Sequence, residues 1–262
     1  MGYESKRMSV TLRCGASLTP RAFRLCVLDC DGVIFNSNRL KTEAYRATLR
    51  EIGVQPDHVD AFVKLHLSDV SVSRFVKFQT FFSEVLPPAA RPELCPEASG
   101  QLTSVERLVE LALDGYSRNC LKLYEALAPV PAAVQFVKAC RRKPFVCSGG
   151  AQTELAHVFA HHKIRSLFDE VLGSPTTKIE HMQRVMSDTQ VAPKDILFIG
   201  DGWTDFKTSM AIGAHFCFLT EMSDWADATQ QIAEGLAAAP QQSITRCSSW
   251  EALLARVVDT GE

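Results

Sequence analysis

Two carboxylates placed two residues apart are the first feature of the sequence that could do chemistry: Asp29 and Asp31 flank Cys30 in LDCDGV. In an extended chain, residues i and i+2 project to the same side, so both carboxylates would face one site. Such a pair can divide the work of phosphoryl transfer. Asp29 would attack phosphorus to form an aspartyl-phosphate, while Asp31 would protonate the leaving oxygen and then deprotonate the hydrolytic water. To donate a proton near neutral pH, Asp31 must have a pKa raised by burial or by a neighbouring carboxylate.

Attack of a carboxylate on a phosphate brings two anions together, so positive charge is required. Two like unit charges about 4 Å apart repel by about 4 kcal/mol at an effective dielectric constant of about 20. Mg²⁺ suits such a site because it binds through one or two carboxylates together with substrate phosphate. We expect its ligands to be Asp29, the backbone carbonyl of Asp31, and Asp201. Lys178 would add a compact positive charge that holds the phosphoryl oxygens and the nucleophile.

Further donors could complete an anion site. The hydroxyl of Ser148 and the backbone amides of Gly149 and Gly150 are expected at a helix start, where N–H groups bind phosphate. Asp205 lies one helical turn after Asp201 in GDGWTD, where it could hold a metal-bound water or orient the lysine. Each of these motifs alone also fits an ordinary turn, helix cap or surface residue. Their occurrence together, each at or just after the end of a predicted strand, favours a shared phosphate-binding site.

The elements that must position these residues are predicted strands. Apolar runs at residues 23–29, 144–150, 170–174, 195–201 and 215–220 are typical of buried parallel strands. Helical stretches lie between them, and residues 243–258 repeat the strand-and-helix pattern, so right-handed crossovers and a parallel sheet are expected. The polar motifs fall at strand ends or directly after them. In open α/β sheets this is the edge that binds ligands.

The interval from residue 38 to residue 130 has helical periodicity and no convincing buried strand. Helices are expected from residue 39 to Gly53 and from residue 72 to 86, with a third opened by a capping box at residues 103–106. The proline-rich segment 87–100 is expected to be a loop without regular structure. We therefore predict a disordered extension at residues 1–22, a catalytic core at residues 23–37 and 131–262, and an inserted helical domain at residues 38–130.

The composition argues against several kinds of partner. Charged residues make up 22% of the chain and the formal net charge is −2, so no global field would recruit nucleic acid or an anionic membrane surface. No apolar run approaches the ~20 residues that span a bilayer, so we expect a soluble, cytoplasmic protein. The nine cysteines are odd in number, and Cys26 and Cys30 lack CxxC spacing, which favours free thiols packed in the core.

The ordered motifs resemble those of the haloacid dehalogenase superfamily over residues 23–258. DCDGV resembles its first motif, Ser148 its second, Lys178 its third, and Gly200-Asp201 with Asp205 its fourth. The resemblance implies a Rossmann-like three-layer α/β/α core with a parallel sheet. It also implies a C1-type α-helical cap at residues 38–130, as in phosphoglycolate phosphatases and β-phosphoglucomutases.

Within this superfamily the residue at position 31 separates reaction classes. By resemblance, dehalogenases lack an acid there and P-type ATPases carry Thr, so Asp31 implies phosphate-ester chemistry. Gly32-Val33 and the residues after them resemble the hinge of a lid. Asn36 departs from the acid that many capped phosphatases carry before Ser37, which weakens the transfer of hinge details.

Substrate choice is expected to lie in the cap. Arg74 and Lys77, three residues apart in VSRFVKF, would share a helix face. They could contact substrate or simply form a solvated face. Arg118 and Lys122 are weaker candidates. The substrate would be a small phosphorylated metabolite, such as a sugar phosphate or related acid.

Two further groups of residues have structural explanations. His157 and His161 share a helix face at i, i+4, a spacing that a zinc site could use, but no acidic partner accompanies them as in HExxH. An ordinary helix surface is favoured. Four phenylalanines are expected to pack in the core of the cap or against the sheet domain: Phe75, Phe78, Phe81 and Phe82.

Three functions remain open on the sequence alone. A Mg²⁺-dependent phosphomonoesterase is favoured. A phosphomutase would use the same phospho-aspartate but return the phosphoryl group to a rotated intermediate. A non-catalytic binding protein on the same fold would be expected to lose a motif residue, and none is lost. A homodimer is compatible with the sequence.

Overall fold

The computed structural model describes residues 22–68, 72–94 and 104–258. Its sheet has six parallel strands in the order β3-β2-β1-β4-β5-β6. The strands are β1 (Leu25–Leu28), β2 (Phe145–Ala151), β3 (Val171–Ser174), β4 (Ile196–Gly200), β5 (His215–Leu219) and β6 (Ile244–Cys247). Strand β1 lies between β2 and β4, where the order of connections reverses. Ligands bind at such a switch point in open α/β sheets.

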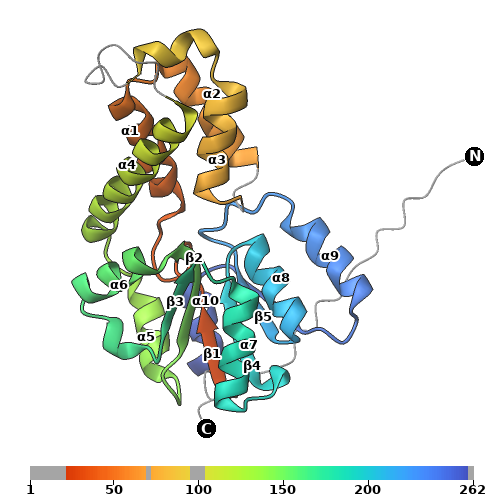
Figure 1. Ribbon diagram of the computed structural model, residues 1–262. Helices are drawn as coiled ribbons and strands as arrows, with labels where there is room; N and C mark the ends of the chain where they lie inside the picture. Colours follow the sequence, from red (N-terminus) through yellow and green to blue (C-terminus); the bar gives the residue numbers. More distant parts are fainter. Residues whose placement is uncertain (1–21, 69–71, 95–103, 259–262) are drawn as a thin grey trace, which may run out of the picture. The chain divides into compact units, whose positions relative to one another are not determined.

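Helices cover both faces of this sheet (Figure 1). Helices α7 and α8 pack together on one face, while α5 and α10 pack together on the other. The helices that follow the insert in the chain are α5 (Pro131–Ala139), α6 (Gln152–His161), α7 (Lys178–Thr189), α8 (Trp203–Ile212), α9 (Ala228–Ala238) and α10 (Trp250–Val258). Short 3₁₀ turns lie at Arg165–Leu167 and Pro193–Asp195. The expected three-layer α/β/α fold is confirmed.

The apolar strands form the core because both faces of the sheet are covered. All four residues of β1 are buried, and so are all five of β4. The rings of Phe198, Phe206 and Phe216 are almost fully enclosed. Trp250 is buried against Phe136, and its indole Nε1 donates to the carbonyl of Val33 at 2.7 Å. This bond fixes the chain a few residues after β1.

The second compact unit consists of Phe35–Pro129 and Ala156–Lys163. It contains α1 (Asn38–Ile52), α2 (Pro56–Ser68), α3 (Arg74–Thr80), a π-helical turn at Phe81–Val85, a 3₁₀ helix at Pro88–Glu93, and α4 (Val105–Ala126). The expected all-helical insert is therefore present. The structure also groups the second half of α6 with it, a segment that the sequence places within the core. The predicted extension at residues 1–22 lies outside the described residues except for its last residue.

Local signals set the helix ends, although the cap that opens α4 is one residue later than the expected capping box at residues 103–106, whose first residue lies outside the described residues. Helix α1 ends at Gly53, whose φ of 99° is the left-handed conformation that favours glycine. Helix α4 begins after Ser104, whose Oγ accepts from the amide of Arg107 at 3.2 Å. One expectation is wrong. Part of the proline-rich segment is regular, because proline fits the first turn of the 3₁₀ helix, where its missing N–H costs no bond.

Aromatic packing holds the helical unit together. The rings of Phe78, Phe81 and Phe82 are fully buried, and Tyr45 stacks on Tyr116 with ring centroids 4.1 Å apart. Phe75 is the exception, because its side chain is 53% exposed, so the expected packing in the helical core is wrong for this residue. The π-helical turn changes the angular spacing of the helix. It places two adjacent phenylalanines in the core, which a regular helical periodicity does not predict.

Two further expectations from the sequence concern membrane-spanning helices and the cysteines. No helix in the described part of the chain is both long enough and apolar enough to cross a membrane. The seven cysteines within the described ranges have free thiols, and all but Cys140 are buried. The expectation that the cysteines pack in the core is confirmed for these six, whereas Cys140 is only partly buried.

Candidate active site

The predicted polar residues of the sheet unit meet where β1, β2 and β4 end. Asp29 follows β1, and its amide donates to the carbonyl of Ile199 at 2.9 Å, which continues the ladder one residue past the strand. Asp201 directly follows β4, and Ser148 lies within β2. Because these three strands are neighbours in the sheet, three distant segments of the chain supply one edge.

Lys178 reaches this edge from the start of α7. The helix begins with a capping box, in which the Thr177 hydroxyl accepts from the Glu180 amide and the Glu180 carboxylate accepts from the Thr177 amide. The Lys178 ammonium lies 2.9 Å from Asp29 Oδ1 and 2.5 Å from Asp205 Oδ1. The lysine is therefore held between two carboxylates from different elements.

Asp205 is buried and fully engaged. Its Oδ1 accepts from Lys178, and its Oδ2 accepts from the amide of Gly202 at 3.1 Å, at the start of α8. Gly200 permits this approach, because a Cβ at that position would overlap the Asp205 side chain. Asp205 thus orients the lysine, one of the two roles considered for it.

Burial and charge shape the electrostatics of this group. Burial, followed by the negative charge of Asp205, raises the pKa of Asp29 to about 7, although Lys178 opposes the shift. Burial alone would lower the pKa of the Lys178 ammonium, but Asp205 and Asp29 outweigh it and hold that pKa above its ordinary range. The lysine therefore stays charged. Burial also raises the pKa of the Cys147 thiol to about 12, so this cysteine is a poor nucleophile.

The donor set fits a hard dication. One carboxylate oxygen from each of Asp29, Asp201 and Asp205 lies within 4.8 Å of the others, and all three residues are buried. Asp29 Oδ1 forms the ion pair with Lys178 yet receives no aligned hydrogen bond. An ion pair that is short but poorly aligned for a hydrogen bond leaves lone-pair capacity on that oxygen. Carboxylate oxygens and excess negative charge are what Mg²⁺ selects.

The serine and glycine segment differs from expectation in one respect. Ser148, Gly149 and Gly150 lie within strand β2, and α6 begins only at Gln152, so their predicted place at a helix start is wrong. The strand continues because Ala151 pairs with Ser174 of β3 after a register shift. The Ser148 hydroxyl accepts from the amide of Gly150 at 3.1 Å, whereas Gly149 is exposed.

The predicted substrate-contacting residues lie in the helical unit. The Arg74 guanidinium sits 4.8 Å from the centroid of the Tyr116 ring. Lys77 is only 3% exposed, and its ammonium lies 2.9 Å from Nδ1 of His66. Burial, together with Lys77, lowers the pKa of His66 to about 4. Lys77 therefore does not lie on a solvated face, whereas Arg118 is an exposed residue.

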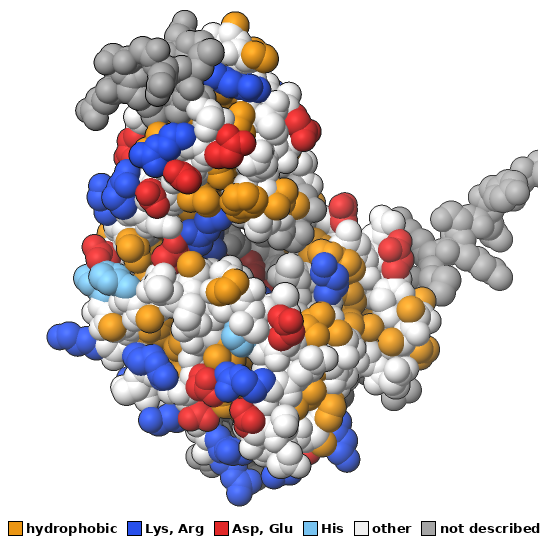
Figure 2. Space-filling view, viewed as in Figure 1, with side chains coloured by type: hydrophobic (Ala, Val, Ile, Leu, Met, Phe, Trp, Pro, Cys, Tyr) orange, Lys and Arg blue, Asp and Glu red, His pale blue; other side chains and the backbone are white. Residues whose placement is uncertain are grey.

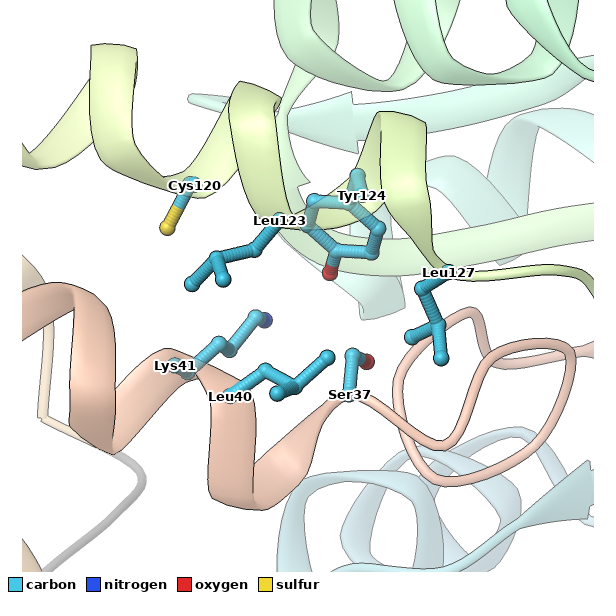
Figure 3. Close-up of a pocket in the computed structure, with 7 residues that line it drawn as sticks. All are labelled: Ser37, Leu40, Lys41, Cys120, Leu123, Tyr124 and Leu127. Atoms are coloured by element: carbon cyan, nitrogen blue, oxygen red, sulfur yellow. The ribbon is translucent and has the colours of Figure 1, made fainter.

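A small cavity in the same unit lies between the start of α1 and the C-terminal half of α4 (Figure 3). It has about 180 Å³ of empty space, part of it open to solvent. Its walls are mainly apolar, with the Lys41 amine and two hydroxyls as polar groups. It contains no carboxylate, so it lacks the chemistry of the sheet edge. The lining residues are Ser37, Leu40, Lys41, Cys120, Leu123, Tyr124 and Leu127.

The sequence analysis did not identify three polar residues that the structure places beside the predicted ones: Thr177 and Glu180 around Lys178, and Glu125 beside His157. Thr177 and Glu180 carry a visible capping-box pattern directly around Lys178, so local inspection could have found them. Glu125 has no such signal. It lies 2.7 Å from His157, 32 residues later in the chain, and supplies the acidic partner that the local sequence lacks.

Replacing Lys178 with methionine should destabilise the fold. Breaking a buried ion pair by removing one partner leaves uncompensated carboxylates and costs about 3–5 kcal/mol. We expect Lys178→Met to lower the free energy of unfolding by this amount in urea denaturation near neutral pH. The exposed residue Lys194 provides a matched control, and Lys194→Met should change stability little. Equal effects of the two substitutions would contradict the pairing described above.

Comparison with known proteins agrees with this geometry. Residues 23–213 match the family model for haloacid dehalogenase-like hydrolases. None of the curated proteins compared with the chain matches it. One similar solved structure is described as a phosphoglycolate phosphatase from Lactobacillus delbrueckii subsp. bulgaricus, with a TM-score of 0.63 and 17% identity over 92% of this chain and 100% of that one. Another is described as a β-phosphoglucomutase from Thermotoga maritima, with a TM-score of 0.61 and 17% identity over 90% of this chain and 99% of that one.

A haloacid dehalogenase-like hydrolase from Streptococcus pneumoniae is also similar, with a TM-score of 0.60 and 15% identity over 89% of this chain and 98% of that one. At these identities the structural likeness establishes the fold. The family match covers well over half of the 262 residues, and it includes the strand ends at which the acidic residues and the lysine meet. The chain therefore belongs to the haloacid dehalogenase-like hydrolase family.

Proposed function

We propose that the protein is a Mg²⁺-dependent phosphomonoesterase that acts on a small phosphorylated metabolite through an aspartyl-phosphate on Asp29. The observation that carries this proposal is the placement of Lys178 between Asp29 and Asp205. This placement puts the proposed nucleophile, Asp29, beside the positive charge of Lys178 at the carboxyl edge of the sheet. A hydrolase of this family needs both a nucleophile and a means to overcome its repulsion from an anionic substrate.

The first step is transfer of the phosphoryl group. A carboxylate oxygen of Asp29 attacks phosphorus, the bond from phosphorus to the ester oxygen breaks, and Asp31 donates a proton to the departing alkoxide. Mg²⁺ held by Asp29, Asp201 and the Asp31 carbonyl would neutralise charge on the phosphoryl oxygens. Asp205 would serve through Lys178 or a metal-bound water, because both of its oxygens already accept hydrogen bonds.

The second step returns the enzyme to its starting state. Asp31, now a carboxylate, takes a proton from water, and the resulting hydroxide attacks phosphorus. The bond between phosphorus and Asp29 then breaks, which releases inorganic phosphate and restores the Asp29 carboxylate. Lys178, Ser148 and the amide of the exposed residue Gly149 would hold the phosphoryl oxygens through both steps. The amide of Gly150 is directed to the Ser148 hydroxyl, so its part would be to orient that hydroxyl.

The names of two structural neighbours point to a substrate class. Phosphoglycolate phosphatase and β-phosphoglucomutase, the names borne by two structural neighbours, refer to a phosphorylated acid and a phosphorylated sugar. This supports a sugar phosphate or related acid as substrate. Arg74 remains our candidate for a substrate contact from the helical unit. Lys77 is buried against His66, which makes it a weaker candidate for direct contact with the substrate.

Phosphate release separates the proposed function from its rivals. We expect Mg²⁺-dependent release of inorganic phosphate from a generic aryl phosphate and from several members of a panel of phosphorylated sugars, acids and nucleotides, without an activating bisphosphate. A phosphomutase must protect its phospho-aspartate from water, so it would instead convert a sugar 1-phosphate to the 6-phosphate and depend on a bisphosphate. A non-catalytic binding protein would release no phosphate from any compound. Either result would refute the phosphatase.

A further inference from the structure

Two histidines and one glutamate come together on the surface of the helical unit. His157 and His161 lie one turn apart in the C-terminal half of α6, and Glu125 is the penultimate residue of α4. All three side chains are exposed. In the space-filling view, histidine side chains form a pale-blue group at the surface beside acidic side chains (Figure 2). None of the three takes part in the chemistry assigned to the sheet edge.

The distances suit a shared ion. His157 Nε2 lies 2.7 Å from Glu125 Oε1, and one ligand atom from each of the three residues lies within 4.8 Å of the others. The two imidazole rings are nearly parallel, with an interplanar angle of 19° and centroids 6.3 Å apart. Two atoms bound to a tetrahedral zinc ion at about 2.1 Å are separated by roughly 3.4 Å. Small rotations of exposed side chains would therefore bring all three atoms onto one ion.

An exposed ion pair explains only part of this arrangement. The contact between His157 and Glu125 could be a surface pair that contributes little to stability, but such a pair involves only two of the three ligand atoms that lie within 4.8 Å of one another. The neighbouring His162 differs from His157 and His161 because its ring is packed against other residues of the helical unit. Its Nε2 is bonded to the carbonyl of Tyr124 at 2.7 Å, and its ring lies against Phe35. It is a packed structural histidine, whereas a ring nitrogen of each of the other two lies within 4.8 Å of a Glu125 carboxylate oxygen.

Helix polarity also favours a cation here. Glu125 lies in the last turn of α4, and His161 is the last residue of α6. The C-terminal end of a helix carries a partial negative charge, which stabilises positive charge placed close to it. Two imidazoles with one carboxylate form the protein donor set of known catalytic zinc sites, which keep a position open for water. Magnesium and calcium instead prefer sites made entirely of oxygen.

We propose that Glu125, His157 and His161 bind a zinc ion, with water completing its coordination. The ion would join the end of α4 to α6 through residues that are 32 or more positions apart in the chain. This site is separate from the proposed magnesium site, which uses oxygen ligands alone. Its existence does not depend on the reaction proposed above.

Zinc titration of the full-length protein tests the assignment. Calorimetry with Zn²⁺ in a large excess of Mg²⁺ keeps the acidic site occupied while the wild type is compared with His161→Gln and Glu125→Gln. Loss of an outer-shell partner alone weakens metal sites by about 10- to 100-fold, so loss of a direct ligand should weaken zinc binding by at least about tenfold. His58, a half-buried histidine of α2, provides the control, and His58→Gln should keep the wild-type affinity.

A second measurement locates the ion. Zinc added to the wild type should shift the imidazole resonances of His157 and His161, assigned from their glutamine variants, and leave that of His58 unchanged. Circular dichroism will show that the variants are folded. Equal zinc affinity in the wild type and in both site variants would overturn the proposal. So would imidazole resonances at these two positions that do not respond to one equivalent of zinc.

Discussion

Replacing Asp29 with asparagine should abolish phosphate release while leaving the protein folded. We expect kcat for a generic aryl phosphate with Mg²⁺ to fall by more than about 10⁴-fold, on the scale seen when a hydrolase loses its covalent nucleophile. The amide has nearly the same shape as the carboxylate but cannot attack phosphorus. A steady-state assay of phosphate release, with an exposed aspartate changed to asparagine as control (Asp169→Asn), measures the effect.

Stability separates a catalytic role for Asp29 from a structural one. Burial and the negative charge of Asp205 raise its pKa, so the ionised carboxylate is costly in the folded state. Lys178 would still be paired with Asp205 in the variant. We therefore expect the free energy of unfolding to stay constant or to rise. A folded variant that keeps its activity would rule out Asp29 as the nucleophile.

Asp31→Asn should have the next largest effect, and its size should depend on the leaving group. Loss of a general acid costs about 10²–10⁴ in rate. An aryl oxide with a low pKa leaves without a proton, so its first step should be little affected, whereas an alkyl alkoxide needs the proton. We expect rates for alkyl phosphates to fall further than rates for aryl phosphates. Comparison of kcat/KM across leaving groups of graded pKa measures this difference.

The same variant should also trap the intermediate. Without a base at position 31, water attacks the phospho-aspartate slowly, so phosphorylated Asp29 should accumulate with an aryl phosphate. Acid quenching followed by mass spectrometry of the peptide that contains Asp29 would detect it. A uniform fall in rate across all leaving groups, with no trapped phosphate, would mean that Asp31 acts on the fold or the metal rather than on protons.

The motifs at the sheet edge were predictable because each is a local pattern. A short apolar run that ends in polar residues indicates a buried strand and its exit, and parallel strands bring their exits to one edge. Asp29, Asp201 and Lys178 were therefore expected near one another before their contacts were known. The capping box at Thr177 and Glu180 belongs to the same class of signal, since it spans only four residues.

Contacts between distant segments were not predictable in this way. Glu125 meets His157 because two helices pack, and nothing in the sequence near either residue specifies that meeting. Phe75 points to solvent although it lies three residues before the buried Phe78 on the same helix, and which part of that helix face is covered depends on the packing of the neighbouring helices. The extension of β2 through Ser148 and Gly150 depends on pairing with β3, so the sequence alone suggested an earlier helix start.

The sequence by itself determined the fold class, the all-helical insert and the identity of the acidic and basic residues at the strand exits, because hydrophobic periodicity and strand-end polarity are local properties. Only the tertiary structure decided that Lys178 is shared between Asp29 and Asp205, and that one oxygen of Asp29 keeps capacity for a cation. Such pairings depend on distances between elements far apart in the chain, and those distances are set by how the sheet and its helices pack.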